Sequence, residues 1–327
     1  MKGKHSIIIY NNFVKYKFEL DHNISVIRGD SGTGKTTLVN MIRSYQVEGR
    51  SSGIELSCDK KCVALIGVGN DWLDSINKIE DAIVFIDEGE KYITSIEFAS
   101  AIKNTDNYYV IVTRNNLYNL PYSVDAIYEI KKSGRFGRLK QTYNHLERIY
   151  GDNIGEEHID LKGIDRIIVE DSNSGYEFFS AVSNRCGNEC VSSGGKSKMS
   201  EEIERTVATK KILAIADGAA FGAEMERANY LIGNREGSKL FLPESFEWLI
   251  LNSGIIKDNE VQQILEAPYD YIDSKKNFSW EQFFSKELIR RTKGSYLAYQ
   301  KSHINSNYLS GDIIKRILAN YFKSLPK

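Results

Sequence analysis

Proline, cysteine and long apolar runs are all scarce in this chain of 327 residues. Only four prolines and four cysteines occur, and no low-complexity tract or internal repeat is visible. No apolar run reaches the roughly 18 residues needed to span a membrane. The apolar stretch 7–9, after the basic first residues, is too short for the core of a signal peptide. We therefore expect a cytoplasmic protein that makes no membrane contact.

The sequence also lacks an excess of one charge. It has 43 basic and 44 acidic residues, which gives a formal net charge of −1. Bulk charge therefore does not indicate a nucleic-acid-binding protein, and any such surface must be a local patch. A hydrophobic content of 41% and a charged content of 27% are typical of globular proteins. The length is sufficient for two domains of roughly 100–200 residues each.

The four cysteines form two C-x-x-x-C pairs, Cys58/Cys62 and Cys186/Cys190. Four thiolates could bind zinc. Zinc sites usually use C-x-x-C spacing, however, and the two pairs lie in different halves of the chain. The pattern therefore favours reduced, partly buried cysteines, with a zinc site as the alternative.

Residues 29–36 read Gly-Asp-Ser-Gly-Thr-Gly-Lys-Thr and fit the phosphate-binding pattern G-x-x-x-x-G-K-[ST]. An apolar strand is expected over 24–28, and a helix is expected to begin at Thr37. In this setting backbone N–H groups surround a phosphate, and the helix N-terminus adds partial positive charge. Lys35 is expected to reach the β- and γ-phosphates, and Thr36 to bind Mg²⁺. The residues expected to bind ATP in this loop are Gly29, Asp30, Ser31, Gly32, Thr33, Gly34, Lys35, Thr36 and Thr37.

An apolar run over 82–86 ends in two acids, Asp87 and Glu88, which is the Walker B pattern. A buried parallel strand would end beside the phosphates, with Asp87 holding Mg²⁺ and Glu88 polarising the attacking water. A further apolar strand over 108–112 is followed by Thr113 and Arg114, either of which could sense the γ-phosphate. A surface role for Arg114 remains the alternative.

Two strands over 6–10 and 13–20 are expected to form a hairpin before the phosphate-binding strand. With that hairpin, the order of motifs over residues 5–145 resembles the ATP-binding-cassette and AAA-like branches of the P-loop ATPases. The L-S-G-G-Q signature of ATP-binding cassettes is absent before Asp87, which argues against their head dimer. A kinase is the other option within this fold. Glu88 favours hydrolysis over phosphate transfer, because a second carboxylate suits the activation of water.

Residues 145–163 lose periodicity and gain glycine and charge, so we place a domain boundary there. A second α/β pattern follows. Strands are expected at 166–169, 190–191, 211–216 and 240–243, and helices at 175–183, 201–209 and 223–232. The expected domains are therefore 1–148 and 160–255, followed by a helical extension over 256–327.

The second pattern resembles the Toprim domain of primases, topoisomerases and OLD-family nucleases. In that domain a glutamate ends the first strand, and a later strand ends in D-x-D-x-x-G. Glu170 matches the glutamate, Asp217 the first aspartate and Gly222 the glycine, whereas Ala219 stands at the second aspartate position. The loop at 194–196 and the run ending at Glu247 are also similar to the nuclease branch.

The resemblance implies a divalent-metal site that cleaves nucleic acid. Carboxylates at strand ends bind Mg²⁺ or Mn²⁺ and position a phosphodiester. Glu170 and Asp217 are the expected catalytic residues and metal ligands, and Glu247 or Asp171 could compensate for Ala219. The alternative is that these acids merely end strands of a flavodoxin-like sheet.

Helices are expected over 279–291 and 310–322, with basic clusters at 290–293 and 315–316. With Tyr296 and Tyr299 nearby, the first cluster could meet a phosphate backbone. A solvated helix face is the alternative and is favoured.

The sequence therefore predicts an α/β protein in which a P-loop ATPase sheet precedes a Toprim-like domain and a helical C-terminal region. ATP and Mg²⁺ are the expected cofactors, with Mn²⁺ as an alternative in the second domain. The expected partners are DNA or RNA, and a partner protein or a second copy of the chain. ATP would gate cleavage in anti-phage defence or DNA processing. The alternative is an ATP-dependent regulatory switch with a degenerate Toprim-like domain.

Overall fold

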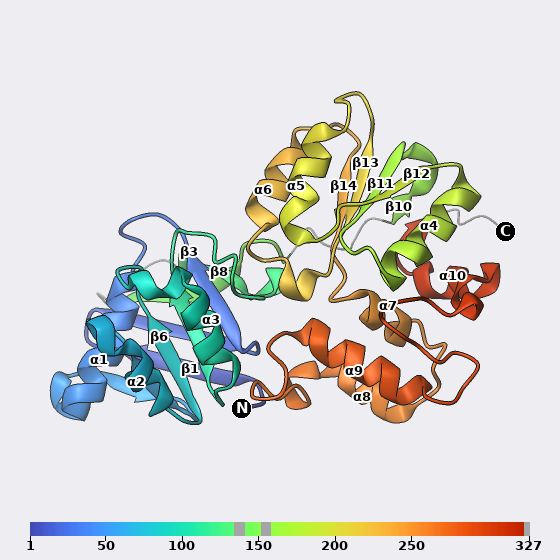
Figure 1. The fold of residues 1–327 in the computed structure, drawn as a ribbon. Helices are drawn as coiled ribbons and strands as arrows, with labels where there is room; N and C mark the ends of the chain where they lie inside the picture. The colour runs from blue at the N-terminus through green and yellow to red at the C-terminus, as the bar shows by residue number, and fades with distance from the viewer. Residues whose placement is uncertain (134–140, 152–157, 324–327) are drawn as a thin grey trace. The chain divides into compact units, whose positions relative to one another are not determined.

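The computed structural model describes residues 1–133, 141–151 and 158–323. Part of the expected boundary segment, 152–157, and the last residues of the expected helical extension, 324–327, lie outside this range. The chain divides into two compact units. Unit 1 comprises residues 1–150 and 267–279, and unit 2 comprises residues 151–266 and 280–327. The fold is α/β (Figure 1).

Unit 1 is built on a nine-stranded, mostly parallel sheet with the order β4-β1-β2-β9-β8-β3-β7-β6-β5. Strands β5, β6, β7, β3 and β8 run parallel to one another at its centre and one end. The bounds of the nine strands are β1 His5–Tyr10, β2 Val14–Leu20, β3 Ile24–Arg28, β4 Glu55–Ser57, β5 Lys61–Ala64, β6 Ala82–Ile86, β7 Tyr108–Val112, β8 Ile127–Ser133 and β9 Thr142–Arg148. The helices of this unit are α1 Lys35–Glu48, α2 Trp72–Asn77 and α3 Ile96–Lys103.

The sequence predicted the central strands closely because they are buried on both faces. Every residue of β3, β6 and β7 is buried, as expected for parallel strands covered on both sides. The expected hairpin is present, since β1 pairs with β2 in antiparallel register. Helix α1 begins at Lys35, two residues before the expected start at Thr37.

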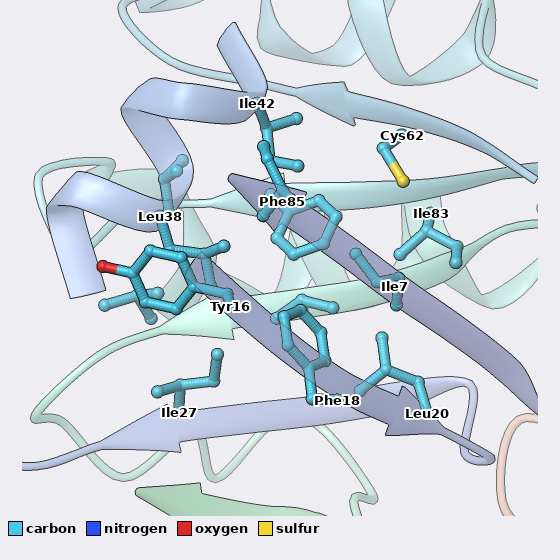
Figure 2. Packing of buried hydrophobic residues seen from close by; sticks show 14 of the residues in the cluster. Ile7, Tyr16, Phe18, Leu20, Ile27, Leu38, Ile42, Cys62, Ile83 and Phe85 are labelled. Atoms are coloured by element: carbon cyan, nitrogen blue, oxygen red, sulfur yellow. The ribbon is translucent and has the colours of Figure 1, made fainter. Parts of the chain in front are cut away.

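One hydrophobic core joins the hairpin to strand β3 and helix α1. Figure 2 shows Tyr16 and Phe18 of β2 packed with Leu38 of α1 and Phe85 of β6. Tyr16 and Leu38 are 1% and 0% exposed. Burying side chains of this size contributes roughly 1.5–3 kcal/mol each, so the sheet holds the start of α1 in a fixed position.

A segment from late in the chain completes unit 1. Residues 267–279 lie between α8 (Asn259–Glu266) and α9 (Trp280–Thr292) in sequence but belong to the sheet unit. The Gly3 N–H donates to the Tyr269 carbonyl at 2.8 Å, and the Asn23 side chain donates to the Phe278 carbonyl at 2.9 Å. Asn23 directly precedes β3, so its hydrogen bond holds residues 267–279 next to the strand that leads into the glycine-rich loop.

Unit 2 contains a parallel four-stranded sheet with the order β12-β11-β13-β14. The strands are β11 Arg166–Val169, β12 Glu189–Ser192, β13 Ile212–Ile215 and β14 Lys239–Phe241. Helices α4 Ser174–Cys186, α5 Lys196–Arg205 and α6 Met225–Gly233 connect them. Figure 1 shows α5 and α6 on one side of this sheet and α4 on the other.

The helix expected at 201–209 differs from the structure, because α5 begins at Lys196 and ends at Arg205. The two preceding glycines have positive φ angles, 73° at Gly194 and 118° at Gly195. They turn the chain out of β12 directly into the helix, since glycine adopts such angles without steric cost.

The C-terminal part of unit 2 is mainly helical. Its helices are α7 Phe246–Asn252, α8 Asn259–Glu266, α9 Trp280–Thr292 and α10 Gly311–Leu318, and a two-stranded sheet pairs β10 Ile159–Asp160 with β15 Phe322–Lys323. Helix α9 packs against α7 and against the short helix η6, Gly218–Ala220. Among the described residues, no helix has both the length and the apolar composition that crossing a membrane requires.

Candidate functional site

The glycine-rich loop predicted to bind phosphate connects β3 to α1 in unit 1. Three of its glycines, Gly29, Gly32 and Gly34, have φ angles of 122°, 80° and 103°. Side chains other than glycine rarely adopt these angles, so the loop needs glycine at these positions. Helix α1 has no acidic residue in its first turn, which leaves its positive N-terminal end available for an anion.

Lys35 is folded into the loop. Its Nζ donates hydrogen bonds to the carbonyls of Gly29 and Asp30, both at 2.6 Å, and lies 3.2 Å from the Thr33 hydroxyl. The residue is 5% exposed, and burial lowers its pKa below the ordinary value. The ammonium therefore lies inside the loop that would hold the phosphates. Thr36 and Thr37 are exposed on the first turn of α1, as a ligand-facing role requires.

Tyr16 supports the loop from below, which sequence reasoning missed. Its hydroxyl donates to the Gly34 carbonyl at 2.9 Å. A Cβ on Gly34 would lie only 2.7 Å from the Tyr16 hydroxyl oxygen. Burial raises the pKa of Tyr16 to about 12, so the phenol stays protonated and keeps donating. The alternation of β2 identifies Tyr16 as inward-facing, but no sequence signal links it to Gly34.

Arg114 joins the ends of β6 and β7 to the loop. Its Nη2 donates to the Ser31 hydroxyl at 2.6 Å, and its Nε lies 3.3 Å from the Glu88 carboxylate. Glu88 follows Asp87, whose Oδ1 accepts the Glu88 N–H at 2.9 Å. The loop, the Walker B acids and Arg114 therefore meet at the carboxyl ends of three neighbouring strands.

Thr113 faces a different direction from Arg114. It is 1% exposed, and its hydroxyl accepts the Asn115 N–H at 3.0 Å. Of the two candidate phosphate sensors, Arg114 is therefore the one that reaches the loop. A further cation from β8, Lys132, lies 3.5 Å from the Gly32 carbonyl, and sequence reasoning had not singled it out.

In unit 2, Glu170 and Asp217 follow the adjacent parallel strands β11 and β13. Val169 pairs with Ile215 in register, so both acids lie at the same edge of the sheet. The Glu170 carboxylate accepts the Asp217 N–H at 3.2 Å, and the Asp217 carboxylate accepts the Phe246 N–H at 2.9 Å. These bonds hold the two acids and the start of α7 together.

Asp171, suggested as a substitute ligand, serves instead as a helix cap. Its carboxylate accepts the backbone N–H groups of Asn173, Gly175 and Tyr176 at 3.2, 3.2 and 2.7 Å. A capping carboxylate of this kind stabilises the start of a helix by about 1 kcal/mol. Its oxygens are thus engaged in holding α4.

Glu247 belongs to the same neighbourhood but is enclosed by the C-terminal helices. It is 1% exposed, and its Oε1 accepts hydrogen bonds from the hydroxyls of Ser285 and Tyr299 at 2.8 and 2.9 Å. Its Oε2 is buried and accepts no hydrogen bond from the described part of the chain.

Two residues that the sequence did not indicate complete the cluster. Helix α9 carries Glu281, whose charge acts on both Asp217 and Glu170. Lys301 forms ion pairs with Glu281 Oε1 at 2.5 Å and with Glu247 Oε1 at 3.9 Å. No local motif marks either residue, because they come from far along the chain.

The clustering of acids alters their protonation. Burial raises the pKa of Glu170 to about 7, with the Glu281 charge adding to the effect. Burial also raises the pKa of Asp217 well above its ordinary value, and the charges of Glu281, Glu170 and Glu247 act in the same direction. Such shifts are frequent at functional sites, although structural acid clusters show them too.

A pocket of about 20 Å³ opens beside these acids, lined by Glu170, Asp171, Asp217 and apolar side chains such as Phe179 and Phe246. This volume holds about one water molecule or one ion. Across the described residues, however, no three His, Cys, Asp or Glu side chains are grouped closely enough to hold a metal ion. The metal ligands proposed from the sequence are therefore near one another but not arranged as a coordination shell.

Arg291, in the basic cluster at 290–293, is neutralised within unit 2. Arg291 is 8% exposed and forms ion pairs with Asp258, Glu260 and Glu287. Tyr299 is 3% exposed and bonded to Glu247. Arg291 is therefore neither a phosphate-backbone contact nor part of a solvated helix face, because its charge is used within the fold.

The four cysteines are free thiols. Cys58 and Cys62 lie close together in unit 1, where the Lys60 N–H donates to Cys58 Sγ at 3.4 Å. Cys186 and Cys190 belong to unit 2. The two pairs are thus divided between the units.

No family model matches this chain, and no curated protein matches it.

Proposed function

We propose that unit 1 binds ATP·Mg²⁺ and hydrolyses ATP. The observation that carries this proposal is the contact of Arg114 with both Ser31 and Glu88, which brings the Walker B strand end to the phosphate-binding loop. Thr36 and Asp87 would hold Mg²⁺, and Glu88 would polarise the attacking water. Lys35 would exchange its bonds to the loop carbonyls for bonds to the phosphates.

The test is ATP binding and hydrolysis by the purified chain and by Lys35→Ala. Removing this cation is expected to weaken ATP binding at least tenfold, about 1.4 kcal/mol. Lys78→Ala is the matched control, because Lys78 is exposed in the same unit and distant in sequence from the loop. Unchanged ATP binding in Lys35→Ala would contradict the proposal. Transfer of phosphate to an acceptor other than water would favour the kinase alternative.

We further propose that unit 2 cleaves DNA or RNA with the help of Mg²⁺ or Mn²⁺, and that ATP in unit 1 gates this step. The supporting observation is that Glu170 and Asp217 lie together at the carboxyl ends of adjacent parallel strands, next to a small pocket. Carboxylates in this position can hold a metal that stabilises charge on the attacking and leaving oxygens. Such a protein would act in the cytoplasm in anti-phage defence or DNA processing, regulated by a partner protein or a second copy of the chain.

Cleavage is tested with supercoiled plasmid and with single-stranded RNA, in ATP and either metal. Glu170→Ala and Asp217→Ala are expected to abolish cutting while ATP hydrolysis continues. Glu236→Gln is the control, since Glu236 is an exposed acid of the same unit. If neither nucleic acid is cut under any of these conditions, the regulatory switch becomes the better account of unit 2.

A further inference from the structure

Lys301 ends among the carboxylates of unit 2. Its Nζ lies 2.5 Å from Glu281 Oε1, 3.9 Å from Glu247 Oε1 and 3.4 Å from the Ser285 hydroxyl. Burial acts to lower the pKa of Lys301, but the charges of Glu247 and Glu281 outweigh it and raise the pKa above its ordinary value. The ammonium is therefore charged and held by two acids at once.

The acids outnumber the cations around it. The charges of Glu170, Glu247 and Glu281 all act on Asp217, and Lys301 interacts with Glu247, Glu281 and Asp217. Carboxylates this close repel unless a cation or protons compensate them. The other nearby ammonium, that of Lys196, donates to the Ala220 carbonyl at 3.0 Å.

One carboxylate oxygen in the cluster lacks a hydrogen-bond donor. Glu247 is 1% exposed, and its buried Oε2 accepts no hydrogen bond from the described residues. A buried carboxylate oxygen left in this way is costly, and a cation beside it would remove the cost. Lys301 engages only the other oxygen, Oε1.

A divalent cation would compete with Lys301 for the same oxygens. Mg²⁺ and Mn²⁺ bind carboxylate oxygens directly at short distances, and a neighbouring ammonium repels them. The ammonium already occupies Glu281 Oε1 and approaches Glu247 Oε1. This accounts for acids that lie near one another without forming a coordination shell.

We propose that Lys301 is a built-in counter-ion of this acidic cluster, and that it lowers the affinity of unit 2 for divalent cations until it is displaced. The inference rests on the proposed metal-dependent function of unit 2 and specifies how that site is regulated. Displacement is feasible because the Lys301 side chain is 41% exposed, so the ammonium can swing into solvent without unfolding the helices around it.

The test is the titration of full-length, chelator-treated protein with MnCl₂ by calorimetry, without nucleotide. Lys301→Met keeps the length of the side chain but removes the charge. We expect the dissociation constant of Lys301→Met for Mn²⁺ to be at least tenfold lower than that of the unchanged protein. Mn²⁺ should also raise the melting temperature of Lys301→Met more than that of the unchanged protein. Lys293→Met is the matched control, because Lys293 is an exposed lysine of the same unit. Both substitutions leave unit 1 unchanged, so any Mn²⁺ bound at the P-loop contributes equally to both variants.

A second variant covers the case in which Lys301→Met does not fold. Lys301→Met combined with Glu281→Gln removes the ion pair as a whole, which leaves no uncompensated partner and is often tolerated. This double variant is also expected to bind Mn²⁺ more tightly than the unchanged protein, through Glu170, Asp217 and Glu247.

The outcomes separate this inference from the proposed nuclease function. Tighter Mn²⁺ binding in a folded variant, with no nucleic acid cut by any protein, supports the counter-ion and counts against the nuclease. Cleavage by the unchanged protein with no gain of Mn²⁺ affinity in either variant overturns the counter-ion and leaves the nuclease standing. A variant that folds but binds no Mn²⁺ at all overturns the inference as well.

Discussion

Arg114 and Glu88 form an ion pair at the carboxyl ends of strands β7 and β6, with 3.3 Å between the guanidinium Nε and the carboxylate. The same guanidinium donates to the Ser31 hydroxyl. One side chain therefore connects a strand end, a candidate water-polarising acid and the phosphate-binding loop. In the exposed setting of this pair the direct contribution to stability is small, at most about 1 kcal/mol. Its importance lies in where it holds Glu88 relative to the loop.

Replacing Arg114 by alanine should therefore affect turnover more than folding. We expect ATP hydrolysis to slow by about tenfold to a hundredfold, because Glu88 loses its positional restraint and the γ-phosphate loses a cation. Arg114→Lys should recover little, since a lysine cannot hold Ser31 and Glu88 at once. Steady-state phosphate release measures this, with Arg43→Ala, an exposed arginine of α1, as the control. Full activity in Arg114→Ala would return Arg114 to the role of a surface arginine.

Glu88→Gln should separate ATP binding from hydrolysis. The amide keeps the shape of the side chain but accepts a proton poorly, so hydrolysis is expected to slow about a hundredfold, the scale of a lost general base. ATP should stay bound, because Lys35 and the loop N–H groups are untouched. Single-turnover hydrolysis and equilibrium binding together measure the two effects, and Glu97→Gln is the control, because Glu97 is an exposed acid of helix α3. A normal rate in Glu88→Gln would remove Glu88 from the mechanism.

Gly34→Ala should disable the phosphate-binding loop for a steric reason. Gly34 has a φ of 103°, and a Cβ there would lie 2.7 Å from the Tyr16 hydroxyl oxygen. Either the loop backbone or the buried Tyr16 side chain would have to shift, and ATP affinity should fall at least tenfold, about 1.4 kcal/mol.

Gly53→Ala separates backbone strain from the steric clash. Gly53 has a φ of 71°, but a Cβ there meets no atom within 4 Å. Gly53→Ala should cost only the backbone strain, about 1–2 kcal/mol of stability, with ATP affinity unchanged. Equal ATP affinities in the two variants would show that the contact with Tyr16 does not shape the loop.

The stability of the metal-free protein should fall as the pH rises through the range in which Glu170 ionises. Burial raises its pKa to about 7 from an ordinary value of 4.5, so the folded state binds the proton more tightly than the unfolded state. The resulting stabilisation is complete below about pH 4.5 and is lost as the pH approaches and passes 7. Each unit of the shift corresponds to about 1.4 kcal/mol.

Denaturant unfolding between pH 5 and pH 8 in the presence of a chelator measures this loss. Glu170→Gln cannot ionise at this position, so its stability should decline less than that of the unchanged protein over the same interval. Asp217 remains in both proteins, and its own raised pKa leaves part of the decline in place. Equal pH profiles for the two proteins would show that Glu170 is not the group responsible.

The sequence anticipated much of the framework because its signals are local. Strands β6 and β7 are continuous apolar runs, and β3 is a short, mostly apolar run. They are followed by an acid, a threonine and a glycine, respectively, and their bounds match the prediction. The loop around Lys35 was recognisable since its chemistry depends on glycines and a lysine at fixed spacing. In unit 2, β11 and β13 were recognised in the same way, with Glu170 and Asp217 as their terminal acids.

What the sequence by itself determined is therefore the order of the elements, the α/β class and the residues at strand ends, because periodicity and turn chemistry act over a few neighbouring residues. Only the tertiary structure decided which distant side chains meet them. Tyr16 reaches Gly34 through the packing of β2 with α1 in one core. The packing of α9 on α7 brings Ser285 to Glu247, and Lys301, which follows α9, pairs with both Glu247 and Glu281. The return of residues 267–279 to unit 1 is likewise a matter of long-range contacts. Such contacts depend on the burial of whole faces and on charges that balance one another in space, and no short stretch of sequence encodes either.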